Sequence, residues 1–348
     1  MTALSQRGPD CEFDGIAGPA LRAAGVRPVA WAEDLGSVGL VEAIGSLPKH
    51  LALLRTLKRR FRKYPYDAVL LVDYPGFHLR VAAAAAAAGI PVLYYIPPQI
   101  WAWGEWRLER LQSVVSRLAV TLPFERDYYR DRGVACSYVG HPLLDRAAIP
   151  AQPVARTALD IPHDRVTLGL FPGSRASEVA RLWPHFRDAA NELAAEYPEL
   201  AVVVAAIEGL EYPGSNAFKV VTDAAELVMA ASTAAICKSG TITLEAALYD
   251  TPHAIAYALH PVTAALARRL ARVDHIGLGN ILADDPAVPE FLQGALTKGA
   301  LAKSVAPLLD GASPETYRQQ EMFADVRAKL GGPGAADRVA AMTMELAA

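Results

Sequence analysis

The sequence predicts an α/β protein made of two Rossmann-like domains that face each other across a cleft. Apolar runs of strand-forming residues alternate with amphipathic helical stretches, which is typical of parallel sheets covered by helices on both faces. The length of 348 residues suits two domains of ordinary size. Residues 142–160 contain three prolines and few strand formers, which predicts an interdomain linker. The expected domains are residues 1–145, with the C-terminal helix 313–348 as a candidate to complete it, and residues 146–312.

The first half begins with ten residues of no clear pattern. Strands are then expected at residues 11–18, 68–74, 91–96, 117–122 and 136–139. Helices are expected at residues 20–24, 40–63, 78–88 and 123–132. The long helix 40–63 carries Leu47, Leu51, Leu54 and Leu57 on one side and many Lys and Arg residues elsewhere. Such a helix can lie on an anionic membrane surface, or pack on the core with a solvated basic face.

The second half repeats the alternation of strands and helices. Strands are expected at residues 166–172, 201–207, 219–222 and 234–238. One helix begins at about Ser177, with Leu182, Phe186, Ala190 and Leu193 at helical spacing, and others follow at 223–231 and after 239. In open parallel sheets ligands bind beyond the carboxyl ends of the strands. The residues that follow the strands are therefore the candidates for function.

Charge and cysteine content exclude several classes of protein. A net charge of −3 gives no overall attraction to nucleic acid. The three cysteines are widely spaced without a CxxC pair, which excludes a structural zinc site and fits a reduced cytoplasmic compartment. The longest apolar stretch, residues 81–90, is too short to span a bilayer. We expect a soluble protein, or one that rests on a membrane surface.

Asp73, at the end of the strand 68–74, is the candidate general base. A carboxylate at this edge of the sheet could accept a proton from a hydroxyl group. The alternative is an acid that caps the following helix. His141, which follows the strand 136–139, could orient a substrate or serve a structural role.

Three tryptophans crowd into six residues after Pro97-Pro98. Trp101, Trp103 and Trp106 are followed by Arg107 and Arg110. Indole rings tolerate the boundary between apolar and wet surroundings, so this loop predicts a surface for a large amphipathic ligand. Core packing accounts for one or two of the rings more easily than for all three.

Two strand-to-helix turns in the second half predict an anion site. Gly173, Ser174 and Arg175 precede one helix, where backbone N–H groups and the helix end favour an anion and Arg175 adds a guanidinium suited to phosphate. Turn geometry alone is the alternative. A Walker lysine loop and an Asp-x-Asp pair are both absent from the sequence, which favours metal-independent chemistry with no metal site.

The second turn has a similar composition. Ser239, Gly240 and Thr241 open a helix that carries Glu245 one turn later. Glu245 could accept hydrogen bonds from a ribose diol, or simply be an acid favoured near a helix start. Two such turns suggest a bound nucleoside diphosphate, and Asn280 supplies a neutral hydrogen-bonding group near a later helix.

Several motifs occur in the order and at roughly the spacing of one family. They are Val72-Asp-Tyr-Pro-Gly-Phe77, Tyr95-Ile-Pro-Pro-Gln-Ile-Trp-Ala-Trp103, Leu122-Pro-Phe-Glu125, Val139-Gly-His-Pro142, Phe171-Pro-Gly-Ser-Arg-Ala-Ser-Glu178, Ser239-Gly-Thr-Ile-Thr-Leu-Glu245 and Gly279-Asn-Ile-Leu282. From about Phe13 to its end the chain resembles lipid-A-disaccharide synthases, which are similar to two-domain glycosyltransferases of the GT-B type.

The resemblance implies an inverting, metal-independent transfer that needs no cofactor. A 2,3-diacylglucosamine unit would pass from its UDP derivative to 2,3-diacylglucosamine 1-phosphate, giving lipid A disaccharide 1-phosphate and UDP. Asp73 matches the family's essential acid and would deprotonate the acceptor 6-hydroxyl. The matches to nucleotide-binding positions are Arg175, Ser239, Gly240, Thr241, Glu245 and Asn280. The tryptophan loop and the basic helix would contact the acyl chains and the cytoplasmic face of the inner membrane. The resemblance is also compatible with an oligomer.

The chain departs from the family pattern in four places. Family members begin with a strand and a Gly-Glu-x-Ser-Gly-Asp loop, and this chain starts after them, which predicts an unpaired place in the first sheet. Gly76-Phe77-His78 replaces Asp-Phe-Asn and removes an acid near Asp73. The stretch between Ile207 and Lys219 is shorter than usual, and Ala283-Asp-Asp285 replaces Ala-Gly-Arg.

Two other functions remain open from sequence alone. One is a UDP-sugar epimerase or hydrolase on the same two-domain scaffold, acting without a lipid acceptor. The other is a shortened, non-catalytic relative that holds nucleotide or lipid. Turnover that depends on the acceptor separates the transferase from both.

Overall fold

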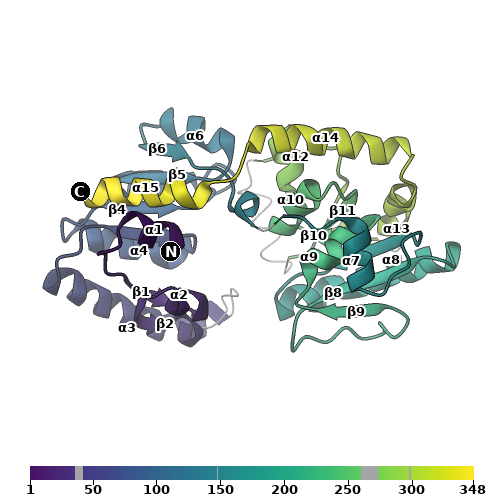
Figure 1. Cartoon of the computed structure of the whole chain (residues 1–348), viewed down its shortest axis with the longest axis horizontal. Coiled ribbons are helices and arrows are strands. Elements are labelled where there is room, and N and C mark those ends of the chain that lie inside the picture. Colours follow the sequence, from purple (N-terminus) through teal and green to yellow (C-terminus); the bar gives the residue numbers. More distant parts are fainter. Residues whose placement is uncertain (36–41, 147, 260–272, 298) are drawn as a thin grey trace. The chain divides into compact units, whose positions relative to one another are not determined.

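The computed structural model describes residues 1–35, 42–146, 148–259, 273–297 and 299–348, with the backbone alone for residues 42–46. Residue contacts divide the chain into two compact units, coloured along the sequence in Figure 1. Unit 1 comprises Met1–Arg146 and Gly332–Ala348, and unit 2 comprises Ala147–Gly331. The first residues of the predicted helix 40–63 lie outside the described residues.

Unit 1 contains parallel strands linked by helices. Its described elements are α1 (Thr2–Arg7), β1 (Asp14–Ala17), α2 (Pro19–Ala23), β2 (Arg27–Trp31), η1 (Ala32–Leu35), α3 (Glu42–Lys63), β3 (Val69–Val72), α4 (Pro75–Ala86), β4 (Val92–Tyr95), η2 (Glu105–Arg107), α5 (Leu108–Val114), β5 (Arg117–Val120), α6 (Pro123–Arg130), β6 (Cys136–Tyr138), η3 (Pro142–Asp145) and α15 (Ala335–Ala347). The sequence predicted most of these elements but assigned neither β2 nor α5.

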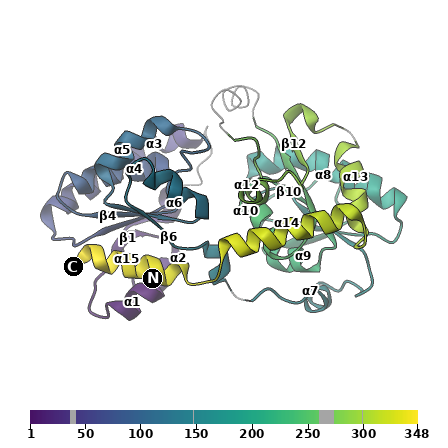
Figure 2. The same cartoon turned by 90° about the horizontal axis from the view of Figure 1, so that it is seen from above.

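The described strands of unit 1 form two parallel sheets. One sheet has the order β3-β4-β5-β6, and the other pairs β1 with β2. Figure 2 shows α3, α4 and α5 on one face of the four-stranded sheet and α15 on the other. The larger core lies under α3 and α4, where Leu53, Leu57 and Phe61 are buried with Tyr94 and Leu118.

Unit 2 has a single described sheet. Its elements are α7 (Gln152–Ala158), β7 (Thr167–Phe171), α8 (Ala176–Glu196), β8 (Ala201–Ala206), β9 (Lys219–Thr222), α9 (Ala225–Ala231), β10 (Ala234–Lys238), α10 (Thr241–Leu248), β11 (His253–Tyr257), α12 (Leu278–Ala283), β12 (Glu290–Leu292), η4 (Gln293–Ala295), α13 (Ala300–Val305), η5 (Ala306–Leu309) and α14 (Pro314–Leu330). The described strands run parallel in the order β12-β11-β10-β7-β8-β9.

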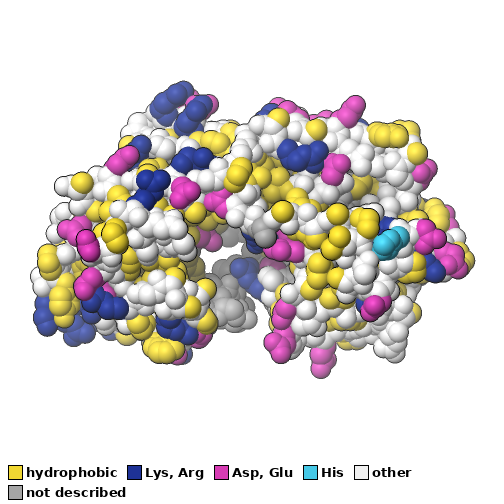
Figure 3. Space-filling view, in the orientation of Figure 1, with side chains coloured by type: hydrophobic (Ala, Val, Ile, Leu, Met, Phe, Trp, Pro, Cys, Tyr) yellow, Lys and Arg dark blue, Asp and Glu magenta, His cyan; other side chains and the backbone are white. Residues whose placement is uncertain are grey.

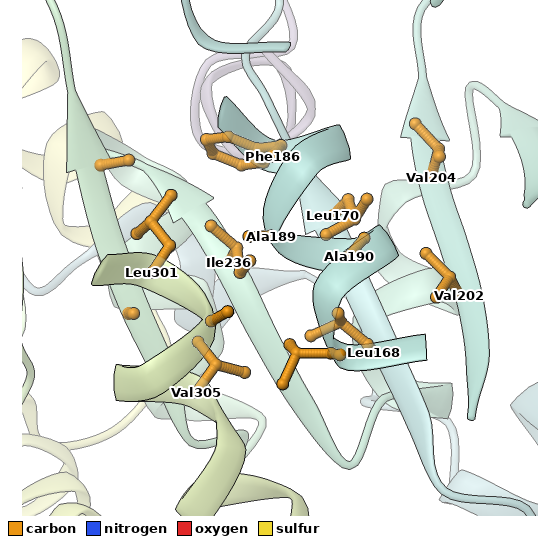
Figure 4. Packing of buried hydrophobic residues seen from close by; sticks show 14 of the residues in the cluster. Leu168, Leu170, Phe186, Ala189, Ala190, Val202, Val204, Ile236, Leu301 and Val305 are labelled. Atoms are coloured by element: carbon orange, nitrogen blue, oxygen red, sulfur yellow. The ribbon is translucent and has the colours of Figure 1, made fainter. Parts of the chain in front are cut away.

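Both faces of the unit 2 sheet are covered, as the apolar strands predict. Leu170 of β7 and Ile236 of β10 pack against Phe186 of α8 and Leu301 of α13 (Figure 4). The opposite face packs against α7, α9 and α10. The helical spacing of Leu182, Phe186, Ala190 and Leu193 is confirmed, because all four side chains are buried.

Two predictions about the elements are wrong and a third is right only in part. The first residues form α1, which contacts α15. The predicted linker 142–160 contains the boundary between the units, after Arg146, but also α7. Pro153 is tolerated in the first turn of α7, and the Arg156 guanidinium donates to the Ala231 and Thr233 oxygens at 3.1 Å. The single C-terminal helix is two helices, because Gly331 and Gly334 adopt φ values of 71° and 105° between α14 and α15.

The apolar side of α3 also differs from the prediction. Leu57 is buried, but Leu47 and Leu51 are 45% and 38% exposed, and Leu53 and Phe61 complete the buried face instead. This helix has apolar residues on more than one side, so helical spacing alone could not show that Leu53 and Phe61 are buried and that Leu47 and Leu51 are not.

Candidate active site

The first anion turn lies between β7 and α8 of unit 2. Gly173 has a φ of 121°, where a side chain is strained. A Cβ at this position would lie 2.8 Å from Oε2 of Glu178, which excludes any larger residue without rearrangement. Ser174 and Arg175 follow and are exposed. The turn therefore brings its backbone close against the Glu178 carboxylate at the start of α8.

The second turn lies beside the first because their strands are neighbours. β10 pairs with β7, with Cys237 opposite Phe171, so both turns emerge at one edge of the sheet. Gly240 has φ 148° and ψ −161°, a conformation that side chains rarely adopt. The Ser239 hydroxyl donates to the Ile276 carbonyl at 3.2 Å, and Thr241 is exposed. The structure thus brings Gly173–Arg175 and Ser239–Thr241 together.

Glu178 joins the two turns through one carboxylate. Its Oε1 lies 3.3 Å from the Arg175 guanidinium and 3.1 Å from Nζ of Lys238, the last residue of β10. Its Oε2 accepts a hydrogen bond from the Ser174 backbone N–H at 3.4 Å. Two cations and a backbone donor thus converge on a single anionic group, as they do on phosphate.

Lys238 was not among the sequence candidates. It ends a strand whose other residues are all buried, and it precedes the Ser239 turn. A lysine at the carboxyl end of a buried parallel strand, next to a Gly-rich turn, is the signal that would have identified it. The ammonium group also lies 5.9 Å from the centre of the Tyr257 ring.

Glu245 and Asn280, the other two predicted nucleotide-binding residues, are buried, unlike Arg175 and Thr241. Glu245 is buried in α10. Burial of the Cys237 thiol raises its pKa, and the negative charge of Glu245 raises it further. Asn280 is fully buried, with its amide donating to Val288 and Glu290 at 2.8 Å and accepting from the Val288 N–H at 3.1 Å. The Asn280 side chain therefore stabilises its own chain in this structure.

Asp73 of unit 1 stands on a strained turn. Asp73 and Tyr74 have φ values of 51° and 52°, in the left-handed region, between β3 and α4. The N-cap of α4 is Tyr74, and it makes no side-chain cap bond. The alternative role of Asp73 as a helix cap is therefore wrong. Its side chain is exposed and makes no hydrogen bond or ion pair with another described residue.

Neighbouring aromatic residues hold this turn through its backbone. The Asp73 carbonyl accepts from the Tyr94 hydroxyl at 2.9 Å and lies 2.7 Å from Nδ1 of His78. The Tyr74 hydroxyl lies 2.7 Å from Nε2 of His50 on α3. Burial lowers the pKa of His78, while its contact with Asp73 acts in the opposite direction. In the family pattern the acid is replaced by Gly76 and the asparagine by His78, which thus places an imidazole beside the backbone of the candidate base.

The three tryptophans separate into two environments. Trp101 is buried, its Nε1 donates to Glu125 at 2.9 Å, and its ring meets Phe124 edge to face. Trp103 and Trp106 are 47% and 62% exposed. The Arg107 guanidinium lies 4.7 Å and 5.5 Å from the centres of their rings. The exposed pair and Arg107 form a surface, which we call the indole surface, whereas Trp101 belongs to the core.

His141 caps a short helix. Its Nδ1 accepts from the Leu143 N–H at 3.3 Å at the start of η3, and the residue is buried. Burial, with a smaller contribution from Arg146, lowers the pKa of His141 to about 4. A neutral imidazole fixed in this way is structural at pH 7.

The described residues contain no group of three or more His, Cys, Asp or Glu side chains that could hold a metal ion. They also contain no helix both long and apolar enough to cross a bilayer.

A family model described as lipid-A-disaccharide synthetase matches residues 1–333. A lipid-A-disaccharide synthase of Geobacter metallireducens is 38% identical over 347 residues, which cover 97% of this chain and 90% of that protein. One of Anaeromyxobacter sp. (strain K) is 40% identical with the same coverage.

Solved structures of low sequence identity share the fold. MurG of Acinetobacter baumannii aligns with 99% of this chain and 94% of its own at a TM-score of 0.58 and 16% identity. UGT71G1 of Medicago truncatula, solved with UDP-glucose, aligns with 100% and 94% at a TM-score of 0.63 and 13% identity. The predicted fold class, with two Rossmann-like domains of the GT-B type, is confirmed.

Proposed function

The chain belongs to the lipid-A-disaccharide synthase family and is a glycosyltransferase, and we propose how its residues perform the transfer. The donor is UDP-2,3-diacylglucosamine and the acceptor is 2,3-diacylglucosamine 1-phosphate. The products are lipid A disaccharide 1-phosphate and UDP, formed with inversion at the anomeric carbon.

Unit 2 binds the nucleotide of the donor. The pyrophosphate receives hydrogen bonds from the backbone of Gly173–Arg175 and Ser239–Thr241 and charge from Arg175 and Lys238. In this arrangement the pyrophosphate replaces the Glu178 carboxylate, which now occupies the same convergent donors. Glu245 accepts from the ribose diol, and Asn280 supports the site by holding the 288–290 segment.

Unit 1 supplies the base and the acceptor surface. Asp73 takes the proton of the acceptor 6-hydroxyl while that oxygen forms a bond to the anomeric carbon. The bond from this carbon to the UDP oxygen breaks, and Arg175 and Lys238 stabilise the charge that develops on UDP. The exposed side chain of Asp73 supports this role, because no internal bond has to be broken first.

The acyl chains lie against the indole surface of Trp103, Trp106 and Arg107. Large exposed aromatic rings beside a cation suit an amphipathic ligand at the boundary of a membrane. Through this surface and the basic helix α3, unit 1 associates with the cytoplasmic face of the inner membrane. Trp101 and His141 act from within unit 1 and do not touch the acceptor.

The convergence of Arg175, Lys238 and the Ser174 N–H on one carboxylate is the observation that carries this proposal. The test measures UDP release from UDP-2,3-diacylglucosamine with and without acceptor, and from UDP-N-acetylglucosamine alone. Acceptor-dependent release of UDP, with formation of the disaccharide, is the expected result. Turnover without acceptor would instead support an epimerase or hydrolase, and UDP binding without any turnover a non-catalytic relative.

A further inference from the structure

The helical layer of unit 1 contains a basic pocket away from Asp73. It has a volume of about 380 Å³ and lies between α3, α4 and the start of α5, which neighbour one another in Figure 2. Its lining residues are Leu54, Lys58, Arg62, Arg80, Ala83, Ala84, Ala87, Ala88 and Arg110. Four of these side chains are cations, none is an acid, and the rest are apolar.

The four cations are not neutralised within the described chain. The side chains of Lys58, Arg62, Arg80 and Arg110 make no ion pair or hydrogen bond with any other described residue. Lys58 and Arg62 lie four residues apart on one face of α3, a spacing at which like charges destabilise a helix. Some other cations of unit 1 are paired, as Arg60 is with Asp14. An external anion would relieve the repulsion within the pocket.

Apolar surface adjoins the cations on the same helix. Leu54 lines the pocket, and Leu51 and Leu47 continue its row one and two turns toward the start of α3, both exposed. Figure 3 shows Lys and Arg side chains beside hydrophobic ones along α3, at the lower left of the view. The alanines of α4 leave the floor of the pocket smooth and without polar groups. A free anion would contact only the cations, whereas an anionic lipid would contact both the cations and the adjoining apolar surface.

The pocket is separate from the proposed reaction centre. Asp73 precedes the first turn of α4, whereas the pocket uses this helix from Arg80, at its middle, to Ala88, beyond its last residue. The alanines that line the pocket begin at Ala83, roughly 12 Å along the helix axis from the first residue of α4. The phosphate of an acceptor held at Asp73 is therefore not the ligand that this position favours.

We propose that this pocket binds the phosphodiester headgroup of an anionic membrane phospholipid, with the acyl chains over Leu51 and Leu47. The inference deepens the proposed membrane association, but it requires neither the donor site nor turnover. Basic residues near an anionic bilayer surface attract it individually, and here four of them share one cavity. The pocket thus fixes where the membrane contacts unit 1.

Two matched double variants of α3 test this proposal. Lys58→Gln with Arg62→Gln removes two pocket cations, and Arg55→Gln with Arg59→Gln removes two exposed cations with the same spacing on the same helix, outside the pocket. Glutamine has a helix propensity close to those of lysine and arginine, so α3 should persist in both. Flotation with vesicles of phosphatidylcholine containing phosphatidylglycerol measures binding, and circular dichroism verifies folding.

The pocket variant should bind these vesicles at least ten-fold more weakly than the unaltered protein, and the control variant less than three-fold more weakly. Equal losses in the two variants would show a diffuse electrostatic attraction and overturn the proposal. Vesicles of pure phosphatidylcholine test the need for an anionic lipid. If all three proteins bound them equally well, and as strongly as vesicles that contain phosphatidylglycerol, the proposal would also be contradicted.

Calorimetry distinguishes the source of the phosphate. Monomeric short-chain phosphatidylglycerol should bind the unaltered protein but not the pocket variant, while inorganic phosphate should bind at least ten-fold more weakly. Comparable affinity for inorganic phosphate would mean that the ligand is a soluble anion and not a lipid. Stronger binding of an acidic peptide or oligonucleotide than of lipid would identify a different class of partner and overturn the proposal. Because no substrate is added, failure here leaves the transferase assay unaffected.

Discussion

The strand ends of the two units differ in how their functional groups are held. In unit 2, Glu178 ties Arg175, Lys238 and the Ser174 backbone into one cluster. In unit 1, Asp73 projects from a turn whose backbone is fixed while its own carboxylate is exposed. A binding site benefits from cations held in advance around an anion, whereas a base must remain accessible to the proton that it accepts.

This difference predicts that the two ends fail in different ways when altered. Changes at Asp73 should affect the chemical step and spare the nucleotide, because they remove no group that binds UDP. Changes around Glu178 should affect nucleotide affinity first.

Asp73→Asn should lower kcat by about two orders of magnitude or more and leave UDP affinity nearly intact. The amide cannot accept the hydroxyl proton as a base. Asparagine tolerates the left-handed backbone of this turn, so the fold should be preserved. Steady-state kinetics and a UDP titration measure the two effects. Full activity in this variant would remove Asp73 from the role of base.

Arg175→Ala should weaken UDP binding by about 1.5–3 kcal/mol, the range for a hydrogen bond to a charged group. Arg181, an exposed arginine of α8 beyond the turn, provides the matched control, and its replacement by alanine should leave the titration unchanged. Calorimetric titration with UDP measures both variants. Equal affinities of the Arg175 variant and the unaltered protein would exclude Arg175 from the site.

Asn280→Ala should lower the free energy of unfolding by about 1–2 kcal/mol, because it leaves the buried N–H and C=O of Val288 without their partner. If Asn280 only supports the site, UDP affinity should change far less than in the Arg175 variant. Urea denaturation and the same titration separate the two effects. A large loss of affinity with unchanged stability would restore Asn280 as a direct nucleotide ligand.

Much of this architecture could be predicted because its signals are local. The buried strands of unit 2 are continuous apolar runs, and the turns after β7 and β10 carry glycines at positions with unusual φ. The rule that ligands bind beyond parallel strands then placed Gly173 and Gly240 at one edge. The register of Cys237 with Phe171 supports that placement.

What the sequence missed depends on contacts between distant residues. Glu178 and Lys238 are 60 positions apart, and only the pairing of β7 with β10 brings them within 3.1 Å. The burial of Trp101 requires Glu125 as an acceptor, so composition could not separate it from Trp103 and Trp106. Asn280 was assigned to the nucleotide because its motif resembles the family's, whereas its amide is bonded within unit 2.

The smallest expected effect concerns Glu178, and its sign decides how unit 2 differs from unit 1. If the carboxylate occupies the place of the pyrophosphate, Glu178→Gln should tighten UDP binding by about 0.5–1 kcal/mol, because the nucleotide no longer displaces an anion from Arg175 and Lys238. The gain should shrink at high salt, where such partly exposed pairs are screened. Weaker binding in this variant would mean that Glu178 positions the cations beside the pyrophosphate, and the cluster would then be a scaffold for the ligand rather than a substitute for it.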